Sequence, residues 1–381
     1  MPALDSIDAQ SGKPPALGWI EVEGYKSIRA AKIDLGAINV LIGANGAGKS
    51  NLLGLFGLLA DLADHRLQLH IGRQGGADAI LHFGHKTTSL LRISLRAGGY
   101  GYEATLVAGA GDTLVFQRES DLSWPGGAAP AGLPEYVPYV GVGGAKETAG
   151  DDARHGAKNF GNRPFTAWMR GWRPFHFHDT GRSAPTKQKH KIDDNRALLS
   201  EGANLAPFLH ALRAVAPGAY RRIVEAVRSI APFFDDFVLE SDVINPGVIQ
   251  LAWRHASDDG LFTADSLSDG TLRFICLATL LLQPELPSLI VVDEPELGLH
   301  PFAISQLAAL VRAAATKTQI ILATQSVTLL DQFDASEVIV AEQTTGESSF
   351  RRLGEAALAN WRQDYSLGEL WLKNVLGGRP R

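Results

Sequence analysis

The eight residues GANGAGKS, at positions 43–50, constrain the fold of this 381-residue chain more than any other stretch. They fit the pattern G-x-x-x-x-G-K-[ST] at every fixed position, directly after the apolar run INVLI and before an apolar helical run. Glycines let backbone N–H groups curl around an anion, and the start of a helix adds partial positive charge. A strand, this loop and a helix in succession therefore predict a phosphate-binding loop rather than a chance Gly-rich turn.

The chemistry of the loop implies a nucleotide and a metal ion. We expect Lys49 to reach the β- and γ-phosphates of ATP and to act in catalysis, and Ser50 to hold Mg²⁺. The residues of this stretch expected to contact the nucleotide are Gly43, Ala44, Asn45, Gly46, Ala47, Gly48, Lys49, Ser50 and Asn51.

A second stretch, LIVVDEPE at positions 289–296, places two carboxylates directly after four apolar residues. An apolar run this dense predicts a strand buried on both faces, and carboxylates at its end are costly unless they face a polar site. A strand that simply ends at the surface is the alternative, which the phosphate loop disfavours. We therefore expect Asp293 to bind Mg²⁺ through water, and Glu294 to orient and deprotonate the water that attacks the γ-phosphate.

A third stretch, SLSDGTLRF at positions 266–274, precedes a long apolar helical run. Ser268 or Asp269 can cap that helix, because a short side-chain oxygen accepts from the N–H groups of the first turn. The same helix start can also be aimed at a phosphate. Both interpretations are open from these residues alone.

Together these stretches resemble the RecF, SMC and OLD type of ABC ATPases, and in particular the stand-alone bacterial proteins called AAA family ATPases. The matching words are GYKSI, GANGAGKSNLL, WRPFHFHDT, SLSDGTLRF, VVDEPELGLHP, ATQS and DYSLGELW, which span about residues 18–378. The separation of 244 positions between Lys49 and Asp293 agrees with this resemblance, since ring-forming AAA+ motors usually place the two motifs much closer.

The resemblance implies that two heads sandwich two nucleotides. The LSDGT signature of one head would then meet the γ-phosphate held by the phosphate loop of the other. Ser268 and the N–H of Gly270 would make that contact, and Asp269 and Thr271 depart from the common LSGGQ form of the signature.

Four further residues take a role from the resemblance alone. His300, in ELGLHP, is implied to lie near the partner's nucleotide, and Gln325, in ATQS, to hydrogen-bond the γ-phosphate during catalysis. Lys26, in GYKSI, is implied to lie near the phosphates. Gln74, in GRQGGAD, is the candidate for the Q-loop glutamine that contacts the metal.

The order of predicted elements indicates an α/β fold of the ABC-type P-loop class, with a mixed core sheet flanked by helices. An antiparallel β lobe and an inserted helical or irregular lobe accompany it. Within the second half, GVIQLAWRH (247–255) is predicted to form one strand. We divide the chain into a leader (1–17), the first part of the ATPase head (18–120), the inserted lobe (121–232) and the second part of the head (233–381).

Composition excludes several classes of protein. The net charge is −5, so any nucleic-acid-binding surface must be local. The single cysteine, Cys276, excludes an internal disulfide and a Cys-based zinc site, and suits a reducing compartment. No apolar stretch reaches about 18 uncharged residues and no signal-peptide core is present, so we expect a cytoplasmic protein without membrane contact.

The stretch 146–196 carries a local positive charge, with eleven Lys and Arg against six Asp and Glu. Its run KQKHK and its tryptophans form either a nucleic-acid or partner surface or a solvated insert. In the same stretch, alternation places His176 and His178 on one face of a predicted strand. With Asp179 they indicate a structural or nucleotide-sensing role rather than a metal site, because no further histidine–carboxylate cluster accompanies them.

Two functions follow from these observations. The first is an ATPase homodimer that closes on MgATP and gates an effector protein, by family analogy a nuclease or toxin in antiphage defence. The alternative is an ATP-controlled DNA clamp in repair or recombination. A nuclease within the chain is not expected, because only about fifty residues follow ATQS, fewer than a domain needs. A transporter ATPase is a poor third, since a membrane segment and the switch histidine are missing.

Overall fold

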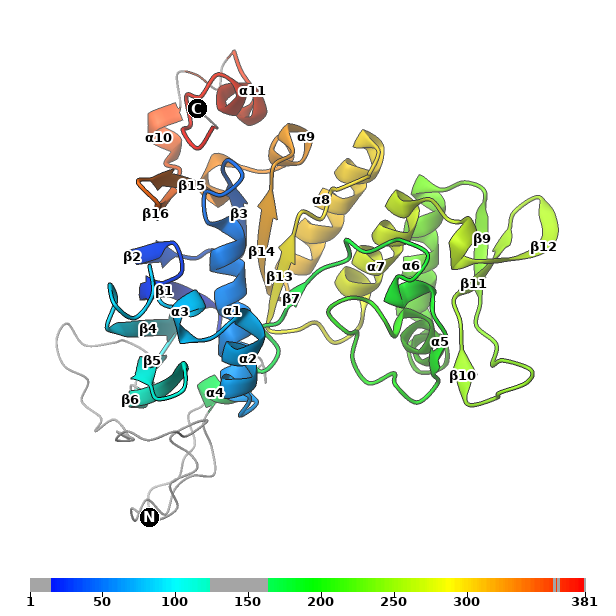
Figure 1. Cartoon of the computed structure of the whole chain (residues 1–381). Helices are drawn as coiled ribbons and strands as arrows, with labels where there is room; N and C mark the ends of the chain where they lie inside the picture. The colour runs from blue at the N-terminus through cyan, green and yellow to red at the C-terminus, as the bar shows by residue number, and fades with distance from the viewer. Residues whose placement is uncertain (1–14, 124–163, 359–360, 362–363, 380–381) are drawn as a thin grey trace, which may run out of the picture. The chain divides into compact units, whose positions relative to one another are not determined.

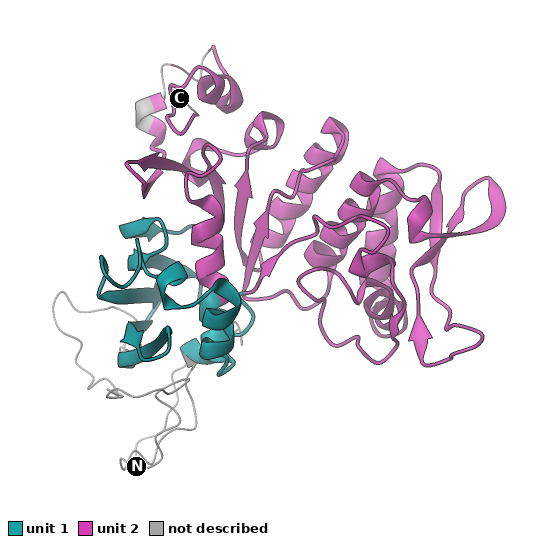
Figure 2. Ribbon diagram, in the orientation of Figure 1, with its two compact units in different colours: residues 1–36, 58–172 teal, residues 37–57, 173–381 magenta. Residues whose placement is uncertain are grey.

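The computed structural model describes residues 15–123, 164–358, 361 and 364–379, which fall into two compact units. The first unit comprises residues 1–36 and 58–172, and the second comprises 37–57 and 173–381 (Figure 2). Helix α1 (Lys49–Ala63) therefore starts in the second unit and ends in the first. Most of the predicted leader, and residues 124–163 of the predicted insert, lie outside the described residues, so the division at 17, 120 and 232 stays a prediction.

An antiparallel sheet forms the first unit, with the strand order β2-β1-β4-β5-β6. Alternate side chains such as Ile20, Val22 and Ile93 are buried, whereas Glu21 and Arg92 face solvent, as expected for a sheet covered on one face. This confirms the predicted β lobe. The elements are β1 (Leu17–Tyr25), β2 (Ile28–Asp34), β4 (Leu90–Ala97), β5 (Tyr100–Gly109), β6 (Thr113–Ser123), α2 (Leu67–Gln74), α3 (Ala77–Ile80) and α4 (Pro164–Met169).

A second sheet forms the centre of the second unit, with the order β16-β15-β3-β14-β13-β7. All neighbours pair in parallel except β16, which is antiparallel to β15. The side chains of β3 and β14 are buried on both faces, which explains why their sequences are mostly apolar rather than alternating. The strands are β3 (Ile38–Ile42), β7 (Pro174–Phe175), β13 (Leu289–Asp293), β14 (Gln319–Thr324), β15 (Val338–Thr344) and β16 (Glu347–Arg352).

Helix α7 (Asp269–Leu282) is the most buried helix of the second unit and packs between α6 (Pro217–Ile230) and α8 (Pro301–Ala315) (Figure 1). A helix that is apolar nearly all round must be enclosed in this way. The described helices include none that is both long and apolar enough to cross a membrane. The remaining helices of this unit are α5 (Leu205–Val215), α9 (Val327–Leu330), α10 (Glu355–Leu358) and α11 (Leu367–Leu372).

The prediction of one strand over 247–255 was wrong. The chain changes partners there: β10 (Val248–Ile249) pairs with β8 (His190–Lys191), and β11 (Ala252–His255) joins a separate sheet. Leu251, between the two, is fully buried in the core and separates them. The separate sheet has the order β12-β11-β9, with β9 (Phe234–Val238) and β12 (Asp258–Thr263).

The segment between β7 and α5 contains little regular structure, and the side chain of Asn204 holds it together. Asn204 is fully buried, and its amide makes three hydrogen bonds of 2.8 to 3.0 Å to backbone groups of residues 194–199. The carbonyl oxygen of Ser200 in turn accepts from the N–H of His176 at 2.8 Å. Asn204 therefore fixes the loop to which the residues after β7 are bonded.

Replacing Asn204 with Leu should lower the free energy of unfolding by about 3 kcal/mol, because three backbone groups would stay buried without partners. Denaturant unfolding measures the change. As a control, Asn195→Ala removes one hydrogen bond, from Nδ2 to the carbonyl oxygen of Ile192, and should cost about 1 kcal/mol. Equal losses for the two variants would contradict the special role of Asn204.

Candidate nucleotide-binding site

The carboxyl ends of three neighbouring parallel strands bring predicted site residues together in the second unit. Strand β3 leads into the phosphate loop, β13 ends at Asp293 and β14 ends at Thr324. The register pairs Asp293 with Ala323, and Thr324 with Ile42, so the three strand ends lie level with one another. In open α/β sheets, this edge is where ligands bind.

The phosphate loop has the backbone geometry that its glycines permit, with φ values of +81° at Gly46 and +102° at Gly48. Lys49 opens helix α1 and is only 6% exposed. Its Nζ donates to the carbonyl oxygens of Gly43, at 2.7 Å, and Ala44, at 3.1 Å. The ammonium group therefore lies within the concave side of its own loop.

An ammonium and three carboxylates share this partly desolvated region. Burial lowers the pKa of Lys49, and the carboxylates of Glu294, Asp293 and Glu296 oppose that shift. Burial likewise raises the pKa values of Asp293 and Glu296. Charges that are kept from water interact strongly and titrate abnormally, which is characteristic of functional sites.

Ser50 and Asp293 fit a magnesium ion. The Ser50 hydroxyl lies 3.2 Å from Asp293 Oδ2, and both groups are hard oxygen donors. Mg²⁺ usually keeps several waters, so a cation on the Ser50 hydroxyl could be reached by the neighbouring Asp293 carboxylate through one of them. A divalent cation would also compensate the partly buried carboxylate of Asp293.

Glu294 adopts a left-handed backbone conformation, with φ of +41°, directly after β13. Its N–H donates to the carbonyl oxygen of Ala323 at 2.8 Å, and its carboxylate accepts from Nε2 of Gln325. Strained non-glycine residues cluster at active sites because the surrounding structure must hold them. Glu294, which follows β13, and Gln325, which follows β14, are both predicted catalytic residues and are thus in direct contact.

Glu296 holds the backbone beside Gln325. Its side chain is only 9% exposed, and Oε1 accepts from the Thr324 hydroxyl, at 2.5 Å, and from the N–H of Gln325, at 3.3 Å. The other oxygen, Oε2, has no partner in the described part of the chain. Reasoning from sequence missed Glu296, although the repeated carboxylate in DEPE was a signal.

The signature and the ELGLHP loop both provide helix caps. Ser268 Oγ accepts from the N–H of Thr271 at 3.1 Å and lies 2.8 Å from the Thr271 hydroxyl, so it caps α7. His300 caps α8, because its Nδ1 accepts from the N–H of Phe302 at 3.2 Å. The capping interpretation of SLSDGT is therefore correct locally, whereas the contact of Ser268, Gly270 and His300 with a partner's nucleotide stays a prediction.

Comparison with known families decides the class of protein. A family model described as "AAA domain, putative AbiEii toxin, Type IV TA system" matches residues 38–130 and 145–331, which is more than half of the chain. The chain belongs to this family of AAA-domain ATPases. The domain is of the ABC type, with the P-loop that binds ATP in such proteins.

Solved SMC heads share the fold of this AAA-domain ATPase. An SMC head bound to the C-terminal winged-helix domain of ScpA covers 91% of the chain and all of its own, with a TM-score of 0.55 and 16% identity. An SMC head with an extended coiled coil, bound to the ScpA C-terminal domain and derived from Pyrococcus furiosus, covers 92% of the chain and 99% of its own, with a TM-score of 0.53 and 15% identity.

A curated relative matches a shorter part of the ATPase. The DNA replication and repair protein RecF of Acidothermus cellulolyticus is 39% identical over 82 residues. This match covers 21% of the chain and 22% of the RecF protein, so the chain spans about a fifth of the length of that relative.

Two predicted residues of the ATPase, Lys26 and Gln74, belong to the first unit and bond to each other. Lys26 Nζ donates to Gln74 Oε1 at 2.9 Å, and burial lowers the pKa of this lysine. Lys26 has a left-handed backbone, with φ of +46°. Their assigned roles at the phosphates and the metal stay predictions.

Two histidines lie beside Asp293, next to the metal position, and their place could not be read from the sequence. Strand β7 pairs in parallel with β13, with Phe175 opposite Val292, so the residues that follow β7 run alongside Asp293. His178 donates from Nε2 to the carbonyl oxygen of Asp293 at 2.8 Å. Burial lowers the pKa of His176, which the Asp293 carboxylate opposes. The alternation in HFH predicted a strand at these histidines, but the regular strand ends at Phe175 and its pairing with β13 could not be predicted from the sequence.

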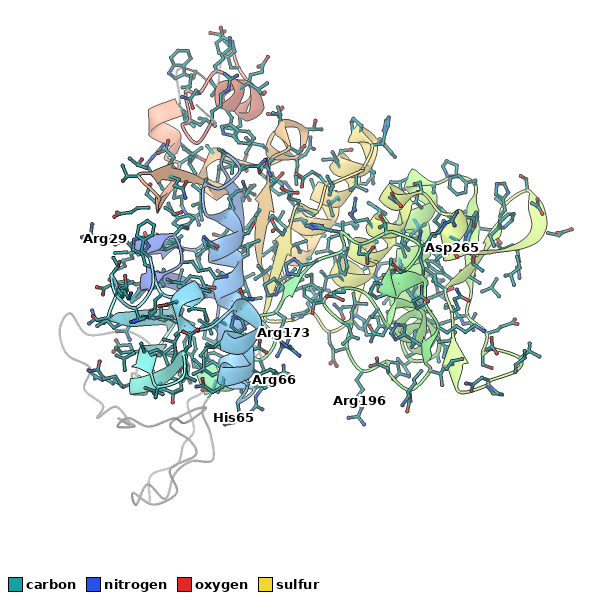
Figure 3. All side chains as sticks on the ribbon, viewed as in Figure 1. Arg29, His65, Arg66, Arg173, Arg196 and Asp265 are labelled. Carbon is teal, nitrogen blue, oxygen red and sulfur yellow. The ribbon has the colours of Figure 1, made fainter. Side chains whose placement is uncertain are left out.

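The lysines of the run KQKHK differ in their surroundings, since Lys187 is buried whereas Lys189 and Lys191 are exposed. Lys187 is only 7% exposed and lies 4.0 Å from Asp265. Lys189 forms an ion pair with Asp242. Arg196, farther along the same segment, points away from its loop (Figure 3). Residues 146–163 of the predicted basic stretch lie outside the described residues.

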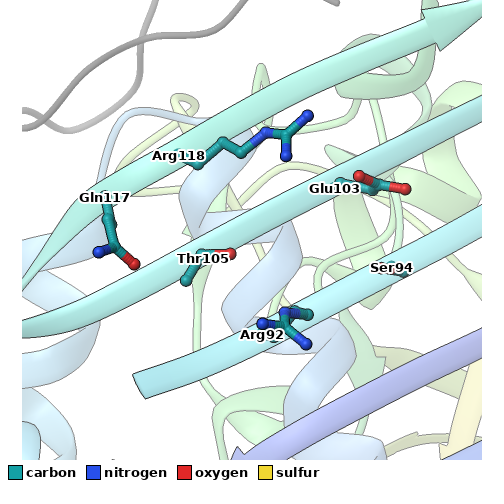
Figure 4. Close-up of a pocket in the computed structure, with 6 residues that line it drawn as sticks. All are labelled: Arg92, Ser94, Glu103, Thr105, Gln117 and Arg118. Carbon is teal, nitrogen blue, oxygen red and sulfur yellow. The ribbon is translucent and has the colours of Figure 1, made fainter. Parts of the chain in front are cut away.

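A polar depression lies on the outer face of β4, β5 and β6 in the first unit, and it is distinct from the residues assigned above (Figure 4). Two arginines and one glutamate are among the side chains that line it, so its charged groups are of mixed sign with one positive charge in excess. The residues that line it are Arg92, Ser94, Glu103, Thr105, Gln117 and Arg118.

Replacing Glu296 with Gln should change how stability depends on pH. Burial raises the pKa of Glu296 above its unfolded value, so its contribution to stability is present below the unfolded pKa and is lost as pH rises through the folded pKa. The uncharged glutamine avoids that loss. The melting temperature of Glu296→Gln relative to wild type should therefore rise as the pH is increased above about 4.3, the ordinary pKa of a glutamate.

Thermal unfolding at a series of pH values tests this expectation. Glu225→Gln, on the exposed face of α6, is the matched control and should track wild type throughout. If the melting temperatures of Glu296→Gln and wild type differ by the same amount at every pH, the buried charge of Glu296 does not affect stability.

Proposed function

We propose that this chain is a magnesium-dependent ATPase that closes as a homodimer on MgATP, reopens after hydrolysis and thereby controls an effector protein. The observation that supports this most directly is the meeting of Lys49, Ser50, Asp293, Glu294 and Gln325 at one edge of the parallel sheet. These are the groups that phosphoryl transfer to water requires.

Binding begins with the phosphate loop. Lys49 would exchange the carbonyl oxygens of Gly43 and Ala44 for phosphate oxygens, which are stronger acceptors for an ammonium group because they are charged. Magnesium, held by Ser50 and through water by Asp293, would neutralise charge on the β- and γ-phosphates.

Hydrolysis then relies on Glu294 and Gln325. Glu294 accepts a proton from water as the water oxygen bonds to the γ-phosphorus and the bond from that phosphorus to the ADP oxygen breaks. Gln325, which already donates to the Glu294 carboxylate, would keep this carboxylate aimed at the water and hydrogen-bond the γ-phosphate. Its uncharged amide serves both contacts without a change in protonation.

Closure would place the signature of one copy over the nucleotide of the other. The start of α7 offers Ser268 and the helix dipole to a phosphate. Two large apolar side chains are exposed here, Leu297 within the ELGLHP loop at 46% and Phe302 directly after it at 51%, and a second head would cover them. The phosphates of ATP, bound between the two heads, would add charged contacts to the apolar contacts made by Leu297 and Phe302.

A separate effector agrees with the comparisons. The family description names the AbiEii toxin and type IV toxin–antitoxin systems, which supports a toxin as the effector. A nuclease effector and a role in antiphage defence extend this proposal beyond that description. The solved SMC head bound to a ScpA domain supports the idea that such a head acts on a second protein. RecF supports a DNA clamp instead, but over 82 residues only, and two of the three lysines of KQKHK, Lys187 and Lys189, are already paired with carboxylates.

The solution mass of Glu294→Gln with and without MgATP tests the proposal. This variant should bind nucleotide without hydrolysing it, so ATP should double its mass from that of the 40.8 kDa chain. Adding Ser268→Arg should abolish the doubling, because the larger cation blocks the signature, and Lys49→Ala should abolish nucleotide binding. A mass that does not respond to ATP, although ATP is bound, would rule out the nucleotide sandwich.

The ATPase rate in the presence of double-stranded DNA separates the effector-gating role from the clamp. We expect DNA to leave the rate of the wild-type protein within about twofold, at low salt as well as at physiological salt. Stimulation that disappears steeply as salt is added would favour the DNA clamp. Lys191→Glu, which changes an exposed lysine of KQKHK, shows whether this segment takes part.

A further inference from the structure

Arg273, in the second turn of α7, is a buried charge that the mechanism above does not use. The side chain is 5% exposed and makes three hydrogen bonds to backbone carbonyl oxygens. Nε donates to Phe177 at 2.9 Å, Nη2 donates to His178 at 3.0 Å, and Nη1 donates to Leu297. One side chain thus joins the signature helix to two segments that are distant in sequence.

Burying a guanidinium among these backbone segments costs free energy, because the cation loses its contact with water. Burial lowers the pKa of Arg273, which reflects the cost of keeping the cation from water. Three carbonyl oxygens offset that cost, because the planar fork of arginine can direct several N–H groups at fixed angles. A lysine would supply one charge without the fork, and an apolar side chain would leave the carbonyl oxygens without a donor.

The bonded carbonyls belong to the segments on either side of the hydrolytic residues. His178, whose carbonyl Arg273 holds, donates from its ring to the carbonyl oxygen of Asp293. Leu297 lies just after Glu294, and its N–H donates to the Glu294 carbonyl oxygen at 3.2 Å. Arg273 is thus linked through one residue, His178, to Asp293, and through one residue, Leu297, to Glu294.

The signature and the loop after β13 also touch through their backbones. A Cβ at position 270 would collide with the carbonyl oxygen of Gly298, so glycine is needed for α7 to come this close. Gly298 itself has a left-handed backbone, with φ of +76°. The first turn of α7 therefore cannot shift without moving residues 297–298, and Arg273 ties both to the segment beside Asp293.

We propose that Arg273 is the positioning residue that couples the nucleotide held by one copy to the signature that the same copy presents to its partner. This rests on the proposed ATP-driven dimer. Binding of MgATP at Ser50 and Asp293 adjusts residues 177–178 and 297, and the guanidinium transmits that adjustment to the start of α7. Without it, a copy still binds ATP but presents its signature in the wrong place.

Two replacements separate coupling from simple support. Arg273→Met keeps the length and removes all donors, whereas Arg273→Lys keeps the charge and removes the fork. Arg228→Met is the matched control, since Arg228 is 47% exposed on α6 and pairs with Asp235. Hydrogen exchange of the nucleotide-free proteins gives the first readout. Arg273→Met should speed exchange in peptides covering 176–180, 268–274 and 296–300 but not in those covering β3 and β14.

Nucleotide response gives the second readout. The affinity of Arg273→Met for MgATP should be within about threefold of wild type, yet its kcat should be at least about tenfold lower. When Arg273→Met is combined with Glu294→Gln, the double variant should not double in mass on addition of ATP. Arg273→Lys should fall between Arg273→Met and wild type, and it provides the same measurements if Arg273→Met does not fold. Arg228→Met should match wild type.

The outcomes distinguish this inference from the function on which it rests. Unchanged exchange in the three peptides, an unchanged kcat, or a loss of ATP affinity as large as the loss of kcat would each overturn the role of Arg273. If exchange changes as expected but wild type neither hydrolyses ATP nor responds to it in mass, the proposed ATPase cycle fails, and the coupling with it, while the support of the three segments by Arg273 stands.

Discussion

The parallel alignment of β3, β13 and β14 is the constraint on which the rest of the structure depends. Because the strands are level, residues separated by more than 200 positions in sequence reach one edge of the sheet, where Lys49, Asp293 and Gln325 follow three different strands. Strands buried on both faces cannot slip in register without exposing apolar side chains. The core thus fixes the distances within the site before any polar contact is made.

The alignment of the three strands concentrates charged side chains at a sheet edge that is partly kept from water. Lys49 lies among Asp293, Glu294 and Glu296, and burial shifts the pKa values of the lysine and of two of these carboxylates toward their neutral forms. The strained backbone of Glu294 adds to the cost. A charged ligand and its cation interact more strongly in such surroundings than in water. The site therefore keeps partly buried charges and a strained backbone, which a strand end with only a structural role would not need.

The sequence predicts the parts of this site whose chemistry is local. GANGAGKS and VVDEPE combine a strand, a turn and polar residues within a few positions, so each could be placed before the structure was known. Asn204, His178 and Arg273 could not, because their roles come from backbone groups supplied by distant segments. KQKHK shows the opposite error, since a run that looks solvated places Lys187 in the interior beside Asp265. The alternation in HFH indicated a strand through His176 and His178, whereas β7 ends at Phe175, one residue before them.

The start of SLSDGT can cap its helix and also contact a phosphate, because the hydroxyl group of Ser268 can accept and donate hydrogen bonds at the same time. Ser268 Oγ accepts from the backbone N–H of Thr271, which caps the helix, and it lies 2.8 Å from the Thr271 hydroxyl. If the Thr271 hydroxyl is the donor of that pair, the Ser268 hydroxyl hydrogen is left to point outward at an acceptor. A threonine in place of the usual glutamine would then orient Ser268 toward the phosphate rather than contact the nucleotide itself. The cap and the phosphate contact would use different atoms and lone pairs of the same side chain, so one serine can serve the fold and the ligand together.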